Sequence, residues 1–447
     1  MRNKFFKVLI FVIAVCMASS FLAGCGSSIS EKNKAVEQAE DKTAQSSANA
    51  EPSKEKAASS VSLYCADFPE QAQQMMDEFM KKYPNISVDF VAMSKTPAEE
   101  LQPKAAADAL PDLMSINGDP FGALLADEGK LADVSDTDAW KNKMDALKGE
   151  WTSPKGIHFG ISGGLCTTIF YYNKDLFKQA GVTAVPDSWE DFLAVCEQLK
   201  KAGITPVIWP GGDPNTLANA PLSYGLAQNI MSKDSGYKDK IKEGALDLNT
   251  KEMADIFAKI KALPDKEYVQ KGFMSTDYNS STQMYVDGKA AMIFQGTWLA
   301  GTLAMTENFD TGVFLPPWNP KGEKKVPVVS SETGFAVSAR SKNLDAAIKL
   351  LEYINGEGYH IYQNQRMCVP HLKGDKIIGE VKLAPQVTEL MKEVDSYNLT
   401  VPLYFSYMPQ EFTGNIQKIM QEVLIGQKTP EQAAKQVDDI VKQAAKK

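Results

Sequence analysis

The sequence predicts an α/β protein, because strand patterns and amphipathic helix patterns alternate along most of its 447 residues. Val61 to Cys65 is a short apolar run typical of a strand, and Gln71 to Tyr83 places methionines and a phenylalanine at helical spacing. Ile86 to Val91 then alternates as a second strand. A strand, a helix and a strand within roughly thirty residues predict a βαβ unit, with two parallel strands and a right-handed crossover.

The same alternation continues toward the C-terminus. Ser188 is a suitable N-cap for the helix that follows it, and Gly203 is suited to end that helix. The final helix begins at Thr429-Pro430-Glu431, where threonine can cap and proline occupies the first turn. The remaining predicted elements are strands at 112–116, 206–209 and 290–294, and helices at 189–202, 345–354 and 413–425.

The N-terminal segment predicts export from the cytoplasm. Basic residues precede the apolar run Val8 to Ser20, which has the length of a signal peptide and is shorter than a membrane span. Leu22-Ala23-Gly24-Cys25 resembles a bacterial lipobox, which implies removal of residues 1–24, diacylglyceryl modification of the Cys25 thiol and anchoring to the outside of the cell membrane. The alternative is an ordinary secretory peptide with a chance cysteine at its end.

A disordered tether is expected between the anchor and the folded part. Residues 25–60 are rich in Ser, Ala, Glu and Lys and contain no aromatic residue, so they cannot bury enough surface to offset the entropy of ordering.

Composition argues against several other functions. The net charge is −8 and no basic run is present, so we expect no nucleic-acid partner. Three histidines are widely separated and lack the spacing of metal ligands, so we expect neither a metal nor a cofactor. Beyond Cys25, four of the six cysteines remain; they show no C-x-x-C pairing and are interpreted as small buried residues, with an isolated disulfide as the alternative: Cys65, Cys166, Cys196 and Cys368.

Four motifs in order are similar to those of one family. They are Phe79 to Val88, Tyr172 to Val182 with its continuation to Phe192, Asp287 to Met292 followed by Gly296-Thr297-Trp298, and Gly426 to Ala433. Over residues 61–447 the chain resembles the extracellular solute-binding proteins of bacterial ABC importers, in the sugar-binding group of the maltose-binding type. The resemblance implies a monomeric, non-catalytic receptor that passes a carbohydrate to the transmembrane subunits of an importer.

The resemblance also implies the periplasmic-binding-protein fold. Two lobes, each a mainly parallel sheet flanked by helices, would close on a ligand by a hinge motion. Motif order places the first lobe at 61–165 plus 335–385 and the second at 168–330 plus 386–447. The crossovers are then expected near 165–168, 330–334 and 382–386.

A sugar presents hydroxyls, which need carboxylates and amides, and apolar C–H faces, which pack on aromatic rings. The resemblance implies that Trp298 stacks on the ligand and that Asp119 binds a hydroxyl. Asp67, after the first strand, is a further candidate. The alternatives are a turn in which Asp119 binds its own backbone, and an N-cap role for Asp67.

Further ligand contacts are predicted at loops that depart from the maltose-binding pattern. Trp209 and Asp213 flank Pro210-Gly211-Gly212, and Glu332 at a crossover faces either the cleft or solvent. Tyr404 and Phe412 are selected from an aromatic cluster in which at least two members are expected to be core. The acid that the family carries at the first crossover is replaced by Cys166 or a neighbour, so the resemblance does not imply a maltodextrin ligand.

Two other functions are alternatives to a carbohydrate receptor. A polysaccharide-degrading enzyme would need two carboxylates about 5–9.5 Å apart, which a sequence alone does not show, and no G-x-S-x-G or H-E-x-x-H motif occurs. A binding protein for a non-sugar, such as a phosphorylated solute, would favour arginine in the cleft, and the folded part contains only Arg340 and Arg366.

Overall fold

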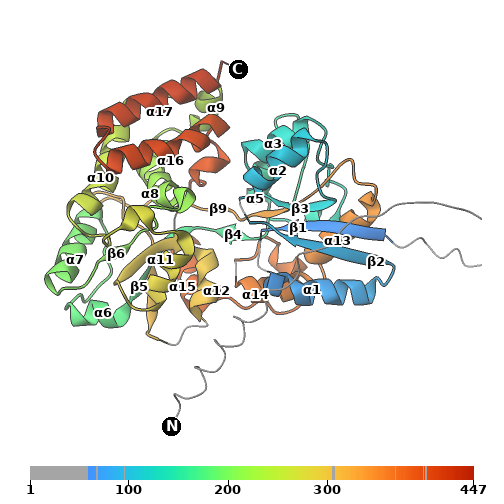
Figure 1. Cartoon of the computed structure of the whole chain (residues 1–447), viewed down its shortest axis with the longest axis horizontal. Coiled ribbons are helices and arrows are strands. Elements are labelled where there is room, and N and C mark those ends of the chain that lie inside the picture. Colours follow the sequence, from blue (N-terminus) through green and yellow to red (C-terminus); the bar gives the residue numbers. More distant parts are fainter. Residues whose placement is uncertain are drawn as a thin grey trace, which may run out of the picture. The chain divides into compact units, whose positions relative to one another are not determined.

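The computed structural model describes residues 59–66, 69–94, 96–304, 308–367, 369–395, 397 and 400–446. The predicted signal peptide, Cys25, the tether, Asp67 and Cys368 lie outside the described residues. Within the described part, two four-stranded sheets and one two-stranded pair form the framework (Figure 1). No helix among the described residues is long and apolar enough to cross a membrane.

The first sheet has the strand order β10-β3-β1-β2. The predicted βαβ unit is confirmed, because β1 (Ser59–Cys65) and β2 (Ile86–Ala92) pair in parallel on either side of α1 (Pro69–Lys82) in the chain. β3 (Leu113–Ile116) is also parallel to β1, whereas β10 (Gly334–Val337) is antiparallel to β3. A strand from far along the chain therefore completes this sheet.

The apolar core of the first sheet, which we call the first core, is covered by helices that precede β4 (Leu165–Cys166) in the chain and by helices that follow β10. Fully buried residues of β1 and α1, such as Leu63 and Phe79, pack with Leu350 of the distant helix α13. The other helices that contribute to this core, besides α1, are α2 (Pro97–Ala106), α3 (Pro120–Asp127), α4 (Asp138–Asn142), α13 (Leu344–Ile354) and α14 (Tyr359–Arg366).

The second sheet has the order β6-β7-β5-β8 and is mixed. β6 (Val207–Ile208) is parallel to β7 (Met292–Gly296), but β5 (Thr168–Asn173) is antiparallel to both β7 and β8 (Thr311–Phe314). The expectation of a mainly parallel sheet is wrong here. A buried strand has the same apolar pattern in either direction, so the pattern does not fix strand polarity.

Alternate residues of the second sheet enter two different cores. Phe170 and Phe294 pack into the larger core, and Ile169 and Ile293 face the smaller one. The helices of the larger core are α6 (Lys174–Gln179), α7 (Trp189–Lys201), α8 (Pro214–Asn229), α9 (Tyr237–Lys242), α10 (Lys251–Asp265), α16 (Gln410–Leu424) and α17 (Pro430–Ala444). Those of the smaller core are α11 (Tyr278–Val286), α12 (Ala300–Ala304) and α15 (Pro385–Asp395).

The helix ends follow the capping signals in the sequence. Ser188 caps α7 by accepting a hydrogen bond from the backbone N–H of Asp191, and Thr429 forms a capping box with Gln432 at α17. Both predicted starts are confirmed. The short helices are α5 (Asp145–Lys148) and the 3₁₀ turns η1 (Gly149–Trp151), η2 (Met231–Lys233), η3 (Phe273–Ser275), η4 (Thr297–Leu299), η5 (Gly374–Lys376) and η6 (Tyr404–Ser406).

A two-stranded pair links the two sheets along the chain. β4 (Leu165–Cys166) runs into β5 of the second sheet, and β9 (Ser330–Ser331) leads back to β10 of the first; the two pair antiparallel (Figure 1). We call β4 and β9 the crossover pair. The lobe boundaries stay a prediction. Before the third expected crossover, Val369 packs in the smaller core of the second sheet, whereas Leu372 forms a β-bridge with Lys143, which follows α4 of the first core.

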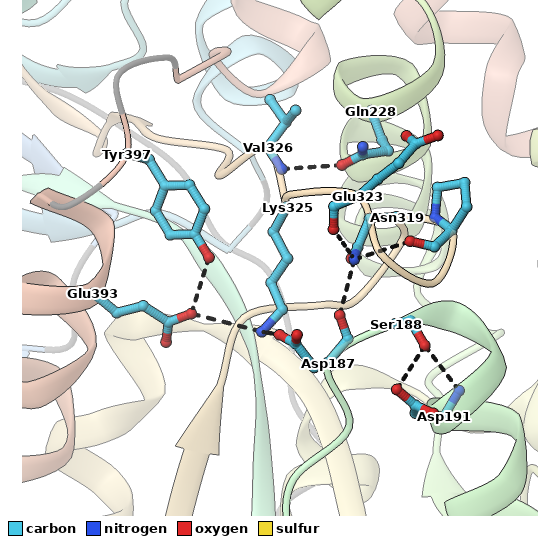
Figure 2. Close-up of polar contacts among 11 residues, drawn as sticks. Asp187, Ser188, Asp191, Gln228, Asn319, Glu323, Lys325, Val326, Glu393 and Tyr397 are labelled. Carbon is cyan, nitrogen blue, oxygen red and sulfur yellow. Dashed lines mark hydrogen bonds and ion pairs between the residues drawn. The ribbon is translucent and has the colours of Figure 1, made fainter.

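The chain that enters β9 is held by a polar network around Lys325 (Figure 2). The Lys325 ammonium forms ion pairs with Asp187 at 3.0 Å and with Glu393 of α15 at 3.6 Å. Tyr397 donates a hydrogen bond to Glu393, while the Gln228 side chain on α8 accepts one from the backbone of Val326. This loop is therefore tied to helices of both cores of the second sheet.

Lys325→Met should lower the free energy of unfolding by about 1 kcal/mol, because the ion pairs disappear while most of the apolar stem remains. The Lys325 side chain is only 7% exposed, whereas Asp187 is 86% exposed and can return to water. Urea unfolding measures the change.

The matched control is Lys321→Met in the same loop. Lys321 pairs with Asp191 at 3.2 Å but is 74% exposed, so its loss should change stability by less than about 0.5 kcal/mol. Equal effects of the two substitutions would contradict a special role for Lys325.

Candidate functional site

Asp119 follows β3 and caps α3. Its carboxylate accepts a hydrogen bond from the backbone N–H of Gly122 at 2.9 Å. Burial raises the pKa of Asp119 to about 6, and hydrogen bonds from the backbone of Gly122 and Phe121 oppose that rise. The backbone-binding alternative is thus what the structure shows for one carboxylate oxygen, and ligand contact stays a prediction.

A second polar contact joins the end of β3 to the residues before β10. Thr333 donates its hydroxyl to Asn117 Oδ1 at 2.7 Å. The neighbouring Glu332 is 4% exposed, and its backbone N–H donates to the carbonyl of Gly164 beside the crossover pair. Glu332 therefore faces the interior rather than solvent, and its contact with ligand stays a prediction.

Trp298 lies in η4, directly after β7, and is partly exposed. Its indole N–H donates to the Tyr278 hydroxyl at 3.2 Å. A Cβ atom at Gly296 would overlap the Trp298 ring, so the glycine lets the ring fold back over the strand end. The position of the ring is therefore fixed from two sides.

Asp213 belongs to the same group of side chains. Burial raises the pKa of Tyr278, the hydrogen bond from Trp298 opposes the rise, and the negative charge of Asp213 adds to it. Asp213 also accepts hydrogen bonds from the backbone and hydroxyl of Thr216 in the first turn of α8. Of the predicted contacts, Trp298 thus binds Tyr278 directly and the charge of Asp213 acts on the same tyrosine, which the sequence analysis missed.

Trp209 has a different environment. It is 2% exposed, and the side-chain amide of Gln270 binds both its backbone N–H and its carbonyl, at 2.8 and 2.7 Å. Its ring borders an aromatic-lined void of about 10 Å³, room for no more than a water-sized molecule. This position favours core packing over the predicted ligand contact.

The aromatic cluster after residue 400 is also mainly core. Tyr404 and Phe412 are 2% and 1% exposed and pack edge-on against each other in the larger core of the second sheet. Tyr407 is buried as well, and Phe405 is partly exposed. The expected core role of at least two members is confirmed. Burial argues against Tyr404 and Phe412 as ligand contacts, because neither ring offers a free face.

Cys166 is buried in β4, and the residue after it connects the crossover pair to the Trp298 turn. The backbone N–H of Thr297 donates to the Thr167 carbonyl at 2.9 Å, and the Thr167 hydroxyl contacts the Tyr224 hydroxyl at 3.1 Å. Among the described residues, no cluster of His, Cys, Asp and Glu is suited to hold a metal ion.

Residues 66–361 match the family model of the bacterial extracellular solute-binding proteins. The chain belongs to this family. Its members bind solutes for transport, so this solute-binding protein is not an enzyme, as its sequence predicts.

The fold is also similar to a solved structure. A structure from work on xylan utilization by Caldanaerobius polysaccharolyticus has a TM-score of 0.77 at 18% identity, and the match covers 85% of this chain and 99% of that one.

Two sugar-binding relatives of this solute-binding protein are each less than 30% identical to it. The multiple sugar-binding protein of Streptococcus mutans is 24% identical over 212 residues, which cover 46% of this chain and 50% of that protein. The chain therefore matches about half the length of that relative. The maltodextrin-binding protein MdxE of Bacillus subtilis is 25% identical over 359 residues, which cover 78% of this chain and 81% of that protein.

Asp119→Asn should change how stability depends on pH. The folded-state pKa of Asp119 is about 6 and the unfolded value about 3.9, so the folded state holds the proton more tightly. Relative to the variant, Asp119 should therefore add stability to the wild type, on the order of 1–3 kcal/mol, as the pH falls from 7 through 6 to 4. Asparagine caps a helix as well as aspartate does but takes up no proton, so this gain should be missing in the variant.

Chemical unfolding at a series of pH values measures both profiles. Asp133→Asn, at an exposed aspartate of the same segment, is the control and should follow the wild type. A constant difference between wild type and Asp119→Asn across this range would show that Asp119 does not titrate there.

Proposed function

We propose that this protein is an extracellular receptor that captures a sugar or oligosaccharide between two lobes and delivers it to an ABC importer. The observation that carries the proposal is the contact of Trp298, directly after β7, with Tyr278 of α11, together with the charge of Asp213 acting on the same tyrosine. It combines a partly exposed indole face, which suits the apolar side of a sugar ring, with a carboxylate that can accept hydrogen bonds from hydroxyls.

Two further observations support a carbohydrate. The chain matches relatives that are named for multiple sugars and for maltodextrin. Asp119 supplies a second carboxylate, and it lies on the other sheet, after β3. A ligand between the two sheets would then be held from both sides, which is the condition for a ligand to favour a closed state.

The lobes are proposed at 61–165 plus 335–385 and at 168–330 plus 386–447, with a hinge at the crossover pair. Two extended residues in each crossover strand can absorb small backbone rotations without disturbing either core. The closed form would be what the transmembrane subunits of the importer recognise.

The protein is further proposed to be tethered to the membrane surface through lipid on Cys25, with residues 26–60 as a flexible spacer. The apolar run before Leu22-Ala23-Gly24-Cys25 supports this, as does membership in an extracellular family.

Calorimetry against a panel of mono- and oligosaccharides should find at least one ligand, and Trp298→Ala should weaken its binding tenfold or more. Burial of such a platform is worth on the order of 1.5–3 kcal/mol, and each 1.4 kcal/mol is a factor of ten. Trp298→Phe keeps a smaller aromatic face and should lose less.

The melting temperature separates the two roles of this tryptophan. A core tryptophan changed to alanine would cost about 3–5 kcal/mol of stability, whereas a ligand platform should leave the fold intact. Unchanged binding together with a collapsed melting temperature would assign Trp298 to the core and remove the main support for the proposal.

Cys25→Ser should abolish lipid attachment, because it removes the thiol that would carry the diacylglyceryl group. Metabolic labelling with a fatty acid in a bacterial host measures this. Ser27→Ala is the control and should be labelled like the wild type. Label retained on the Cys25→Ser protein would show that the lipid is not carried by Cys25, and an unlabelled wild type would leave only the ordinary secretory peptide.

A further inference from the structure

Glu150 binds hydroxyl groups from two distant segments through a single carboxylate oxygen. Oε2 accepts hydrogen bonds from the hydroxyl and the backbone N–H of Ser331, at 2.7 and 3.2 Å. The hydroxyls of Ser330 and Ser406 approach the same oxygen at 3.4 and 3.5 Å. We call these four residues, Glu150, Ser330, Ser331 and Ser406, the Glu150 cluster.

The members of the cluster come from three parts of the fold. Glu150 is in η1 beside Trp151, which is fully buried in the first core. The two neighbouring serines form β9 of the crossover pair. Ser406 is in η6, whose Tyr404 packs in the larger core of the second sheet. One carboxylate thus connects the first core, the crossover and the second core.

Other contacts hold the cluster in place on each side. The Trp151 indole N–H donates to the Ser331 hydroxyl at 2.9 Å. The Ser330 hydroxyl accepts from the backbone N–H of Leu403 at 3.1 Å and lies 3.0 Å from the Ser406 hydroxyl. The serine hydroxyls that Glu150 binds are therefore already oriented by other contacts. Their hydrogen bonds to Glu150 should lengthen or break when one core moves relative to the other.

A buried lysine lies within electrostatic reach of Glu150. Lys143 is fully buried, its ammonium lies 4.6 Å from the centre of the Trp151 ring, and it has no hydrogen-bond partner within the described part of the chain. Burial lowers the pKa of Lys143, and the negative charge of Glu150 opposes that effect. The charge of Glu150 thus favours the protonated form of Lys143, while the serines donate hydrogen bonds to the Glu150 carboxylate.

We propose that Glu150 is a positioning residue for ligand capture: it acts through the crossover pair, by stabilising one arrangement of the two cores relative to the other. The inference rests on the proposed function. A rotation about the crossover pair changes the separation of Glu150 and Ser406, while Ser331 moves with the crossover. Loss of the carboxylate therefore changes the equilibrium between arrangements, and through it the apparent affinity for ligand.

The test uses Glu150→Gln and Ser406→Ala, with spin labels on cysteines introduced at two exposed positions, Leu124 of α3 and Ile425 at the end of α16. Pulsed electron resonance measures the distance between the labels with and without ligand. The Kd is measured by calorimetry with the sugar that binds best in the panel. Glu128→Gln, an exposed glutamate of the same segment, is the control and should change neither quantity.

Both cluster variants should change the label distance in the ligand-free protein, and Glu150→Gln should change the Kd at least threefold. The two changes must be linked in sign: a shift toward the ligand-bound distance tightens binding, and a shift away from it weakens binding. Ser406→Ala should act in the same direction with a smaller effect, and it keeps the test available if Glu150→Gln folds poorly.

Unaltered label distances in both variants would overturn the inference, and so would a changed Kd without a changed distance. Failure of the proposed function looks different. In that case no sugar in the panel binds, whereas the ligand-free distances still report whether Glu150 governs the arrangement of the cores.

Discussion

The antiparallel pairing of β4 with β9 is the constraint on which the rest of the structure depends. Leu165 and Cys166 face Ser331 and Ser330, and on either side of these few residues the chain enters a different sheet. Each sheet buries its own apolar residues, so neither core relies on the other for its packing. The contacts between the two halves described above include the crossover pair and the hydrogen bonds of Glu150 to Ser331 and Ser406.

Local features of the fold were predictable because their causes are local. Caps such as Ser188 and Thr429 act within three residues, and the β1–α1–β2 unit follows from the spacing of apolar residues. The antiparallel direction of β5 was not predictable, because it depends on its pairing with β7, which lies more than a hundred residues later. The apolar pattern of a buried strand is the same in both directions.

The candidate site was predictable only in part, for the same reason. Trp209 and Trp298 both follow an apolar strand and lie near glycine, but Gln270 and the surrounding rings bury the first, whereas the second stays partly exposed beside Tyr278. The contacts of Tyr278, of Thr333 with Asn117, and of Glu150 with Ser331 join residues 20, 216 and 181 positions apart. Composition and periodicity do not report such pairs; only the folded chain brings them together.

The late position of β10 has a consequence for the order in which the molecule is made. β1, β2 and β3 are synthesised first, but their sheet and core are completed by β10 and by Leu350 of α13. A chain that emerges N-terminus first must hold these apolar strands unfinished while the residues between Ile116 and Gly334 follow, which include most of the second half. Contacts at such sequence separation slow folding. The first half thus lacks its last strand and a core helix until Ile354, of 447 residues, has been synthesised.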